Sequence, residues 1–524
     1  MEQTNTLPGI ELEPHAAAAA PPAAEEDLAG RERRFKPIDR VQQVLHPVEV
    51  EGLVAEDDAV RAIWELVGDL DLSRYQERVR AVEERAGRPA TNPRLLASLW
   101  IYAYSQGVSS AHEIERLCHY HPAYMWLTGL QRISAVTLCV FRRTDPKALR
   151  QLFAEVLGVM AAKGLITLER VVQDGTKLQA CASADTFRGQ ESIAAKIAEA
   201  LRLVEALERQ EEAGGGETVS PQKAAALRRQ LQKRELAREE LKKLRAVKAK
   251  KNKDPEEAKI SLTDPEARIM KKPHGGYEPS YNGQIVVDSK AGMVVAAAIS
   301  QSSSDAESLV AGLEQVEQNC GRKPEQVVVD GGYTTHSNIV EAKRLGVELY
   351  GSLGDSAARS AAGCKRWGIS EEFRPEAFRY QEAENCFICP AGKTLIYRSR
   401  SEDELTGEVR HSYQAAAAEC GACECKAQCC PKTNGGRTVS RVEMAPAVAE
   451  LKARMETPEA KAIYQQRKQL IELVNGWLKT KLGLRQFRLQ GLIKVGMELL
   501  WACLAYNIRI WIRLRRAGSP APPG

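Results

Sequence analysis

The sequence has little that would place the protein in a membrane. Its most apolar late stretch, residues 491–514, is interrupted by Lys494, Glu498, Asn507 and Arg509. A membrane-spanning helix needs about 20 mostly apolar residues with few or no charges, so we predict a buried helix here. The N-terminus lacks a basic segment before an apolar run, and we therefore expect no signal peptide. A cytoplasmic protein without membrane contact is the expectation.

The chain also lacks a strong charge of either sign. Its 74 Lys and Arg residues exceed its 69 Asp and Glu residues by only 5, so net charge identifies no partner. The 524 residues are too many for one ordinary core and predict roughly two to four folded units. The Ala- and Pro-rich residues 1–33 predict a disordered tail, and residues 515–524 a short C-terminal tail.

Helical patterns dominate two parts of the chain. Residues 34–165 carry apolar residues at three- and four-residue spacing, which predicts short helices. A helix-turn-helix unit and a plain helical bundle both fit this pattern. Residues 190–252 predict two amphipathic helices in an antiparallel hairpin. The second of these helices ends in a very basic segment, which either faces solvent or contacts a DNA backbone.

Strand signals around this hairpin predict a mixed α/β sheet. A strand in "LERVVQDGTK" is predicted to end on Asp174, and a β-hairpin is predicted around "DSKAG" from residue 277. The segment "SSDAESLVAGLEQVEQN" predicts a helix capped by Ser303 or Ser304. A strand in "QVVVDGGY" is predicted to end on Asp330, and a final helical region to begin at about residue 446.

The two Asp-Gly sequences suggest a metal site. Each follows a Val run, and ligands of open α/β sheets bind beyond the carboxyl ends of the strands. If the two strands are neighbours, Asp174 and Asp330 lie side by side and repel each other unless a cation lies between them. Oxygen ligands of this kind suit Mg²⁺ or Mn²⁺. The alternative is that each Asp only caps the following turn.

A third carboxylate, Glu472, lies in "YQQRKQLIELVNGWLK". Helical periodicity places four residues on one apolar face of this segment: Leu470, Leu473, Val474 and Trp477. Glu472 falls on the opposite, polar face. On periodicity alone it is a solvated residue that pairs with Lys468 one turn away.

Seven of the 13 cysteines lie between residues 386 and 430. Two Cys-x-x-Cys pairs, which begin at Cys386 and Cys420, are typical of a zinc-ribbon knuckle. Four thiolates would close a structural zinc site, for which the candidates are Cys386 or Cys389 with Cys420, Cys423 and Cys429. An iron–sulfur cluster and plain reduced thiols are the alternatives.

Four motifs follow one another along the chain: "DGTK" after a Val strand, "YNGQIVVDSKAGMVVA", "VVVDGGY" and "YQQRKQLIELVNGWLK". In this order they resemble the motifs of bacterial insertion-sequence transposases of the DDE type. The resemblance begins at "RFKPIDRVQ", continues through "GRPATNPRLLASLWIYAYSQGVSSAHEIERLC" and ends at "LAYNIRIWIRL", and so covers nearly the whole chain. The family carries a Cys-Pro-x-Gly element and a later Cys-x-x-Cys plus Cys. These correspond to Cys389, Cys420, Cys423 and Cys429, which leaves Cys386 as a possible substitute ligand.

The resemblance implies a ribonuclease-H-like catalytic domain. The two Asp and one Glu of the family correspond to Asp174, Asp330 and Glu472, and its Tyr…Arg…Glu…Lys signature to Tyr464, Arg467, Glu472 and Lys479. The implied domains are a helical DNA-binding domain (34–165) and a catalytic domain (166–350 and 446–514). The helical hairpin (190–252) and a Cys-rich metal-binding insertion (352–440) interrupt the catalytic domain.

The implied activity is phosphoryl transfer on DNA by a transposase, a polynucleotidyl transferase. The three carboxylates would hold two Mg²⁺ (or Mn²⁺) ions, which promote attack first by water and then by the freed 3′-hydroxyl. No nucleophilic side chain is needed. Arg467, Lys468 and Lys479 would grip phosphates, and Tyr464 would stack on a base or pack. The implied partners are the terminal inverted repeats, the target DNA and further copies of the chain.

One stretch departs from the family. The sequence "QRISAVTLCVFRRTDP" stands where relatives usually carry a Pro-Asp/His-x-Thr-like stretch before Phe-Arg. This departure favours an alternative, an inactive transposase-derived regulator that binds DNA. A metal-dependent nuclease that cleaves without joining is a third interpretation. The presence of all three acidic residues favours the active enzyme.

Overall fold

The computed structural model describes residues 47–79, 81, 89–212, 220–272, 275–354 and 356–517. The predicted tail at 1–33 lies outside these residues, as do residues 518–524 of the predicted C-terminal tail. The chain divides into the units Met1–Val48 and Glu49–Gly524. Every element below belongs to the second unit.

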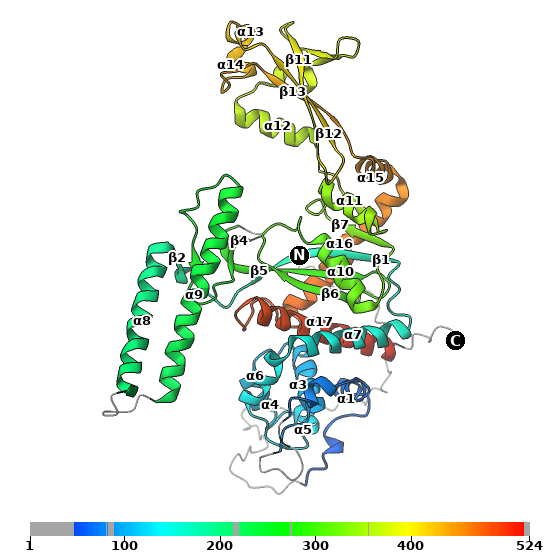
Figure 1. The fold of residues 1–524 in the computed structure, drawn as a ribbon. Helices are drawn as coiled ribbons and strands as arrows, with labels where there is room; N and C mark the ends of the chain where they lie inside the picture. The colour runs from blue at the N-terminus through cyan, green and yellow to red at the C-terminus, as the bar shows by residue number, and fades with distance from the viewer. Residues whose placement is uncertain are drawn as a thin grey trace, which may run out of the picture. The chain divides into compact units, whose positions relative to one another are not determined.

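The N-terminal part of this unit is helical, as predicted (Figure 1). Asn92 accepts a hydrogen bond from the backbone N–H of Arg94, and Pro93 occupies the first turn, both of which favour a helix start at this point. The helices are α1 (Ala59–Gly68), α2 (Ser73–Gln76), α3 (Pro93–Ser105), α4 (Ala111–Leu117), α5 (Pro122–Thr128), α6 (Ala135–Thr144) and α7 (Pro146–Ala162).

A mixed six-stranded sheet follows, which confirms the predicted α/β class. Its order is β4-β5-β1-β7-β8, and β6 pairs with β5. The pairs of β5 with β1, β4 and β6 are antiparallel, whereas β7 runs parallel to both β1 and β8. The strands are β1 (Arg170–Gln179), β4 (Arg268–Lys271), β5 (Tyr277–Asp288), β6 (Val294–Ser300), β7 (Gln326–Val329) and β8 (Glu348–Gly351).

Helices connect and cover the strands of this sheet. They are α10 (Leu309–Cys320), α11 (His336–Arg344), α15 (Pro446–Glu456), α16 (Pro458–Thr480) and α17 (Leu492–Arg516). By length and composition α17 is the one described helix that could cross a membrane, but 89% of its most apolar window is buried inside the protein. The predicted buried helix is therefore confirmed. Glu498 of α17 is fully buried and accepts hydrogen bonds from the backbone N–H groups of Arg488 and Leu489.

The predicted helical hairpin is present. The helices α8 (Gln190–Glu212) and α9 (Pro221–Lys250) lie side by side, and a two-stranded sheet of β2 (Phe187–Arg188) and β3 (Ile260–Ser261) lies at their base (Figure 1). The basic end of α9 is partly neutralised by the loop that follows it. Arg245 pairs with Glu256, and the Nζ of Lys248 lies 3.5 Å from a carboxylate oxygen of Glu257.

The Cys-rich segment between β8 and α15 forms an antiparallel sheet of order β13-β12-β11-β10-β9. It has its own small core, which includes Phe387, Leu395 and Tyr413. Its elements are α12 (Ser356–Trp367), β9 (Arg379–Gln381), β10 (Cys386–Ile388), β11 (Thr394–Glu402), β12 (Val409–Ala415), α13 (Ala417–Gly421), α14 (Lys426–Cys429) and β13 (Thr438–Glu443).

The two ends of this segment are joined by ion pairs. On the incoming side, β8 carries Glu348, whose carboxylate lies 3.1 Å from Nε of Arg454 on α15. A second pair joins Lys343 of α11 to Glu450 of α15 at 2.6 Å. The turn before β12 also contacts α11. A carboxylate oxygen of Glu408 lies 2.6 Å from Nδ1 of His336 at the start of that helix.

We expect Glu498→Leu to lower the free energy of unfolding by about 2–6 kcal/mol, because two backbone N–H groups lose their acceptor at about 1–3 kcal/mol each. Glu498→Gln keeps one side-chain oxygen as an acceptor and should cost less. Urea unfolding of both variants measures the difference. Equal losses would show that the hydrogen bonds to Arg488 and Leu489 do not carry the effect.

Candidate functional site

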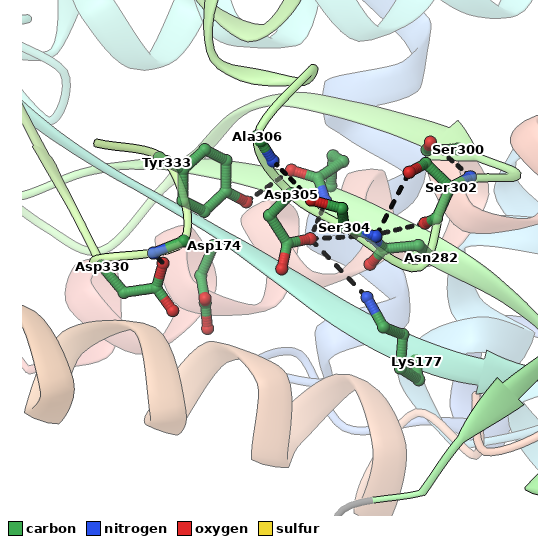
Figure 2. Close-up of polar contacts among 12 residues, drawn as sticks. Asp174, Lys177, Asn282, Ser300, Ser302, Ser304, Asp305, Ala306, Asp330 and Tyr333 are labelled. Carbon is green, nitrogen blue, oxygen red and sulfur yellow. Dashed lines mark hydrogen bonds and ion pairs between the residues drawn. The ribbon is translucent and has the colours of Figure 1, made fainter. Parts of the chain in front are cut away.

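The candidate site lies where β1 and β7 run side by side. Val172 pairs with Val328 in parallel register. Continued for two more residues at the same offset, this register brings Asp174 level with Asp330, which directly follows β7. Figure 2 shows the two carboxylates next to each other and pointing the same way. The two Val-rich strands are therefore neighbours, which is the condition under which the sequence places the two aspartates side by side.

The end of β1 differs from the prediction. The strand does not end on Asp174 but continues to Gln179, and Asp174 pairs with Ile285 of β5. The reason is the length of β5, which supplies ladder partners along the whole of β1. Asp174 therefore does not cap a turn. Asp330 does, because its Oδ1 accepts a hydrogen bond from the backbone N–H of Gly332 at 2.8 Å.

The environment of Asp174 opposes its ionisation. Burial raises the pKa of this carboxyl to about 6; Arg467 acts against the shift, and the neighbouring Asp330 adds to it. The guanidinium Nη1 of Arg467 lies 4.0 Å from Oδ1 of Asp174. The amide of Asn475 donates a long hydrogen bond of 3.4 Å to Oδ2. These two contacts only partly balance two adjacent carboxylates.

Both Arg467 and Asn475 come from α16, whose buried apolar residues include Ile471, Val474 and Leu478. Leu473 is 52% exposed, so the apolar face predicted from periodicity is wrong at this position. The helix is turned so that polar side chains as well as apolar ones meet the sheet. Neither Asn475 nor its contact with Asp174 was predicted from the sequence.

Glu472 lies on the outer side of the same helix. Its side chain is 64% exposed, and a carboxylate oxygen lies 3.8 Å from Nζ of Lys468, which is the pair that periodicity predicts. Within the residues that the structure describes, no group of three or more His, Cys, Asp or Glu side chains is arranged to hold a metal ion. The described geometry thus joins Asp174 to Asp330 and leaves Glu472 apart from them.

The other signature residues differ in their surroundings. Tyr464 packs against the core, and the guanidinium of Arg467 lies 5.6 Å from its ring centroid. Burial lowers the pKa of Lys479, while the charge of Asp174 acts in the opposite direction. Lys479 is therefore close enough to Asp174 to feel its charge, whereas Lys468 faces solvent with Glu472.

A polar cluster around Asp305 is the part of the site that sequence reasoning missed. Oδ1 of Asp305 accepts hydrogen bonds from the amides of Asn282 at 2.6 Å and Gln284 at 2.7 Å, and Nζ of Lys177 lies 3.6 Å away (Figure 2). The hydroxyl of Tyr333 donates to the side-chain oxygen of Gln284. Asp305 also contributes to the raised pKa of Asp174, after burial and Asp330.

Asp305 was missed because the predicted start of α10 lies too early in the chain. The predicted cap at Ser303 or Ser304 is incorrect, because α10 begins at Leu309 after Ser308. The residues before it form a loop in which Asp305 turns to its amide partners on β5. An Asp inside a Ser run is itself a loop signal, since these side chains bind nearby backbone groups, and that signal could have located the loop.

Six thiols gather in the Cys-rich segment. They line one cavity of about 20 Å³, room for a single water molecule or ion: Cys389, Cys420, Cys423, Cys425, Cys429 and Cys430. Burial raises the pKa of Cys429 to about 12, against the effect of Arg437. Cys386 does not line this cavity, and its thiol instead lies near Gln381 and Glu384.

We expect Asp174→Asn to raise the free energy of unfolding by about 2–3 kcal/mol at pH 8. The folded carboxyl holds its proton to about pH 6 and the unfolded one to 3.8, so the cost of ionising it is absent below pH 3.8 and complete above about pH 6. The gain should therefore nearly vanish at pH 4. Urea unfolding at both pH values, with the exposed Asp69→Asn as control, measures it. An equal gain at both would contradict burial as its cause.

Comparisons with known proteins give two family matches. Residues 388–511 match a family described as "Transposase DDE domain", and residues 48–144 match one described as "Transposase domain (DUF772)". The first match includes Glu472 and four of the predicted metal-binding cysteines, but neither Asp174 nor Asp330. No curated protein matches the sequence.

One similar solved structure is described as "Cryo-EM structure of piggyBac transposase synaptic complex with hairpin DNA (SNHP)". It shares 8% identity and a TM-score of 0.30, and the match covers 89% of this chain and 76% of that chain. A similarity this low carries no argument. The family matches do: they show that residues 388–511 are similar to a transposase DDE domain and residues 48–144 to a second transposase domain.

Proposed function

We propose that the protein binds the ends of its insertion sequence, cleaves the DNA by hydrolysis with two divalent metal ions, and joins the freed 3′-hydroxyl ends to target DNA. Its partners are the terminal inverted repeats, the target DNA and further copies of the chain, and it acts in the cytoplasm. The observation that carries the proposal is the placement of Asp174 level with Asp330 on adjacent parallel strands.

The sheet supports a ribonuclease-H-like catalytic core. Three antiparallel strands (β6, β5 and β1) continue into two parallel strands (β7 and β8), and helices α10 and α11 make the connections. This core comprises residues 166–350 and 446–514, interrupted by the helical hairpin and the Cys-rich insertion. The helices of residues 34–165 are then the DNA-binding domain.

The side chains present fit a divalent cation. Asp174 and Asp330 are hard oxygen donors that repel each other without one, and the buried Oδ1 of Asn475 beside them lacks a hydrogen-bond partner among the described residues. Asp174, Asp330 and Glu472 would hold the ions. Such ions stabilise the negative charge on the attacking and leaving oxygens of a phosphodiester. Glu472 would have to leave Lys468 and turn toward Asp174.

The protein's own cations would bind the DNA strand. Arg467 and Lys479 lie on the side of α16 that meets Asp174, so they would hold phosphates near the scissile bond. Lys468 is exposed and would contact a phosphate farther out. The ring of Tyr464 would pack against the guanidinium of Arg467 and help to position it, rather than stack on a base. These contacts would fix the position of the DNA strand and carry no sequence information.

A second candidate function is favoured by the placement of Glu472. Its exposed carboxylate lies apart from the other two, as it would in an inactive transposase-derived regulator that binds DNA without cutting it. A nuclease that cleaves without joining needs the same carboxylates as the transposase. An assay with labelled DNA ends, Mg²⁺ and a target plasmid separates the three by joined product, cleavage alone or binding alone.

The Cys-rich insertion is proposed to hold one structural zinc ion. The proposed ligands Cys389, Cys420, Cys423 and Cys429 all line the same small cavity, and thiolates are favoured zinc ligands. Zinc binds the deprotonated thiolate, so binding would release protons, and burial raises the pKa of the Cys429 thiol. The position of Cys386 argues against its use as a substitute, whereas Cys425 and Cys430 are placed to replace a lost ligand.

We expect Asp174→Asn and Asp330→Asn to lower DNA cleavage more than about a hundredfold, because each removes a group that supports the metal site, while DNA binding persists. Glu472→Gln should do the same if its side chain joins the site. Glu459→Gln, in the first turn of the same helix, is the matched control. Cleavage by the Asp174→Asn protein at the wild-type rate would end the assignment.

We also expect protein purified under reducing conditions to contain about one zinc ion per chain, as a closed four-thiolate site requires. Cys423→Ser should lower the zinc content and the thermal stability. Cys386→Ser, outside the cavity, should change neither. Inductively coupled plasma mass spectrometry gives the metal content, and wild-type protein free of zinc and iron would favour plain reduced thiols.

A further inference from the structure

The first strand of the sheet carries a lysine three residues after Asp174. Lys177 is only 21% exposed, and so is its partner Asp305. The charges of Asp305, Asp174 and Asp330 all act on its ammonium group. Figure 2 shows Lys177 turned toward Asp305 rather than toward the two carboxylates of the candidate site, and no role for it follows from the proposed metal ligands.

Asp305 is held firmly by neutral partners. The amides of Asn282 and Gln284 donate to its Oδ1, and the hydroxyl of Tyr333 holds the other end of the Gln284 side chain. These hydrogen bonds fix the carboxylate without neutralising its charge, because every donor is uncharged. The carboxylate of Asp305 keeps its negative charge, and Lys177 is the cation that lies next to it (Figure 2).

The glycine of the "DGTK" segment makes this contact possible. A Cβ atom at Gly175 would overlap both Oδ1 of Asp305 and the amide nitrogen of Gln284. Any side chain at this position would push Asp305 away from the strand. The segment thus combines a candidate metal ligand, a residue that admits Asp305, and the lysine that Asp305 attracts.

The contact leaves the lysine able to bind something else. The distance of 3.6 Å between Nζ and Oδ1 exceeds that of an ordinary hydrogen bond, about 2.7–3.2 Å. An ammonium group has three N–H donors, and Asp305 restrains its position without saturating them. A tethered cation of this kind, within range of the charges of Asp174 and Asp330, suits an anion with several acceptor oxygens.

We propose that Lys177 binds a phosphate of the DNA strand at the candidate site, and that Asp305 is the residue that positions it. This inference rests on the proposed function. Lys177 would contact a phosphate oxygen adjacent to the scissile bond, from the strand that also carries Asp174. Asp305 would act only through Lys177 and would not touch the DNA.

A double-mutant cycle on DNA cleavage tests the proposal. Lys177→Gln should lower kcat/KM by about ten- to a hundredfold, the effect of one charged hydrogen bond, and Lys177→Arg should recover part of the loss. Asp305→Asn should lower it less. If Asp305 acts through Lys177, the double variant has the rate of Lys177→Gln alone. Independent, additive losses would overturn the positioning role.

The matched control is another lysine–carboxylate contact of the same unit. Lys323 lies 3.7 Å from Glu317 at the far end of α10, and Lys323→Gln with Glu317→Gln should leave cleavage unchanged. Thermal unfolding of all variants separates folding defects from site defects. A loss of activity in Lys177→Gln that only follows a lower unfolding temperature would overturn the phosphate contact.

Equilibrium binding to a labelled terminal DNA duplex without divalent metal keeps this inference separate from the proposed function. Lys177→Gln should weaken binding and reduce the slope of log affinity against log salt by about one contact. Wild-type protein that binds but never cleaves would contradict the proposed function alone. An unchanged slope together with wild-type cleavage in Lys177→Gln would contradict this inference alone. Wild-type protein that neither binds nor cleaves would contradict both.

Discussion

The parallel pairing of β1 with β7 is the constraint on which the candidate site depends. Its register is set by fully buried valines such as Val171 and Val327. This register brings Asp174 level with Asp330 despite the repulsion between their charges. The sheet therefore holds two carboxylates together, and burial, with a smaller contribution from Asp330, raises the pKa of Asp174. The two aspartates are thus already placed together, whereas Glu472 is paired with Lys468 on the outer side of α16.

The sequence predicts most of the elements because their signals are local. The β-hairpin, the helical hairpin and the strand before Asp330 follow from periodicity and turn residues. The predictions are wrong where contacts with residues far away in the sequence determine the bounds or the orientation of an element. The first strand continues past Asp174 because β5 pairs with it, α10 starts late because Asp305 has partners on another strand, and Leu473 is exposed because polar residues of α16 also face the sheet.

The residues of the candidate site likewise fall into those that the sequence predicts and those that only the structure shows. The pair Asp174 and Asp330 is predictable because two similar motifs on neighbouring strands suffice to bring them together. Glu472 rests on the family resemblance, since its helix presents it to solvent. Asp305 and Asn475 enter the site through contacts with residues far away in the sequence. No single-sequence pattern contains such contacts, so only the folded chain reveals them.

The ion pairs that join β8 and α11 to α15 have a consequence for how the chain tolerates change. Glu348 with Arg454, and Lys343 with Glu450, fasten the point where the chain leaves the sheet to the point where it returns. These contacts connect β8 and α11 directly to α15, in addition to the contact that Glu408 of the intervening segment makes with His336. Because β1 and β7 pair directly with each other, the spacing of the two aspartates does not depend on the length of the segment between Gly351 and Pro446.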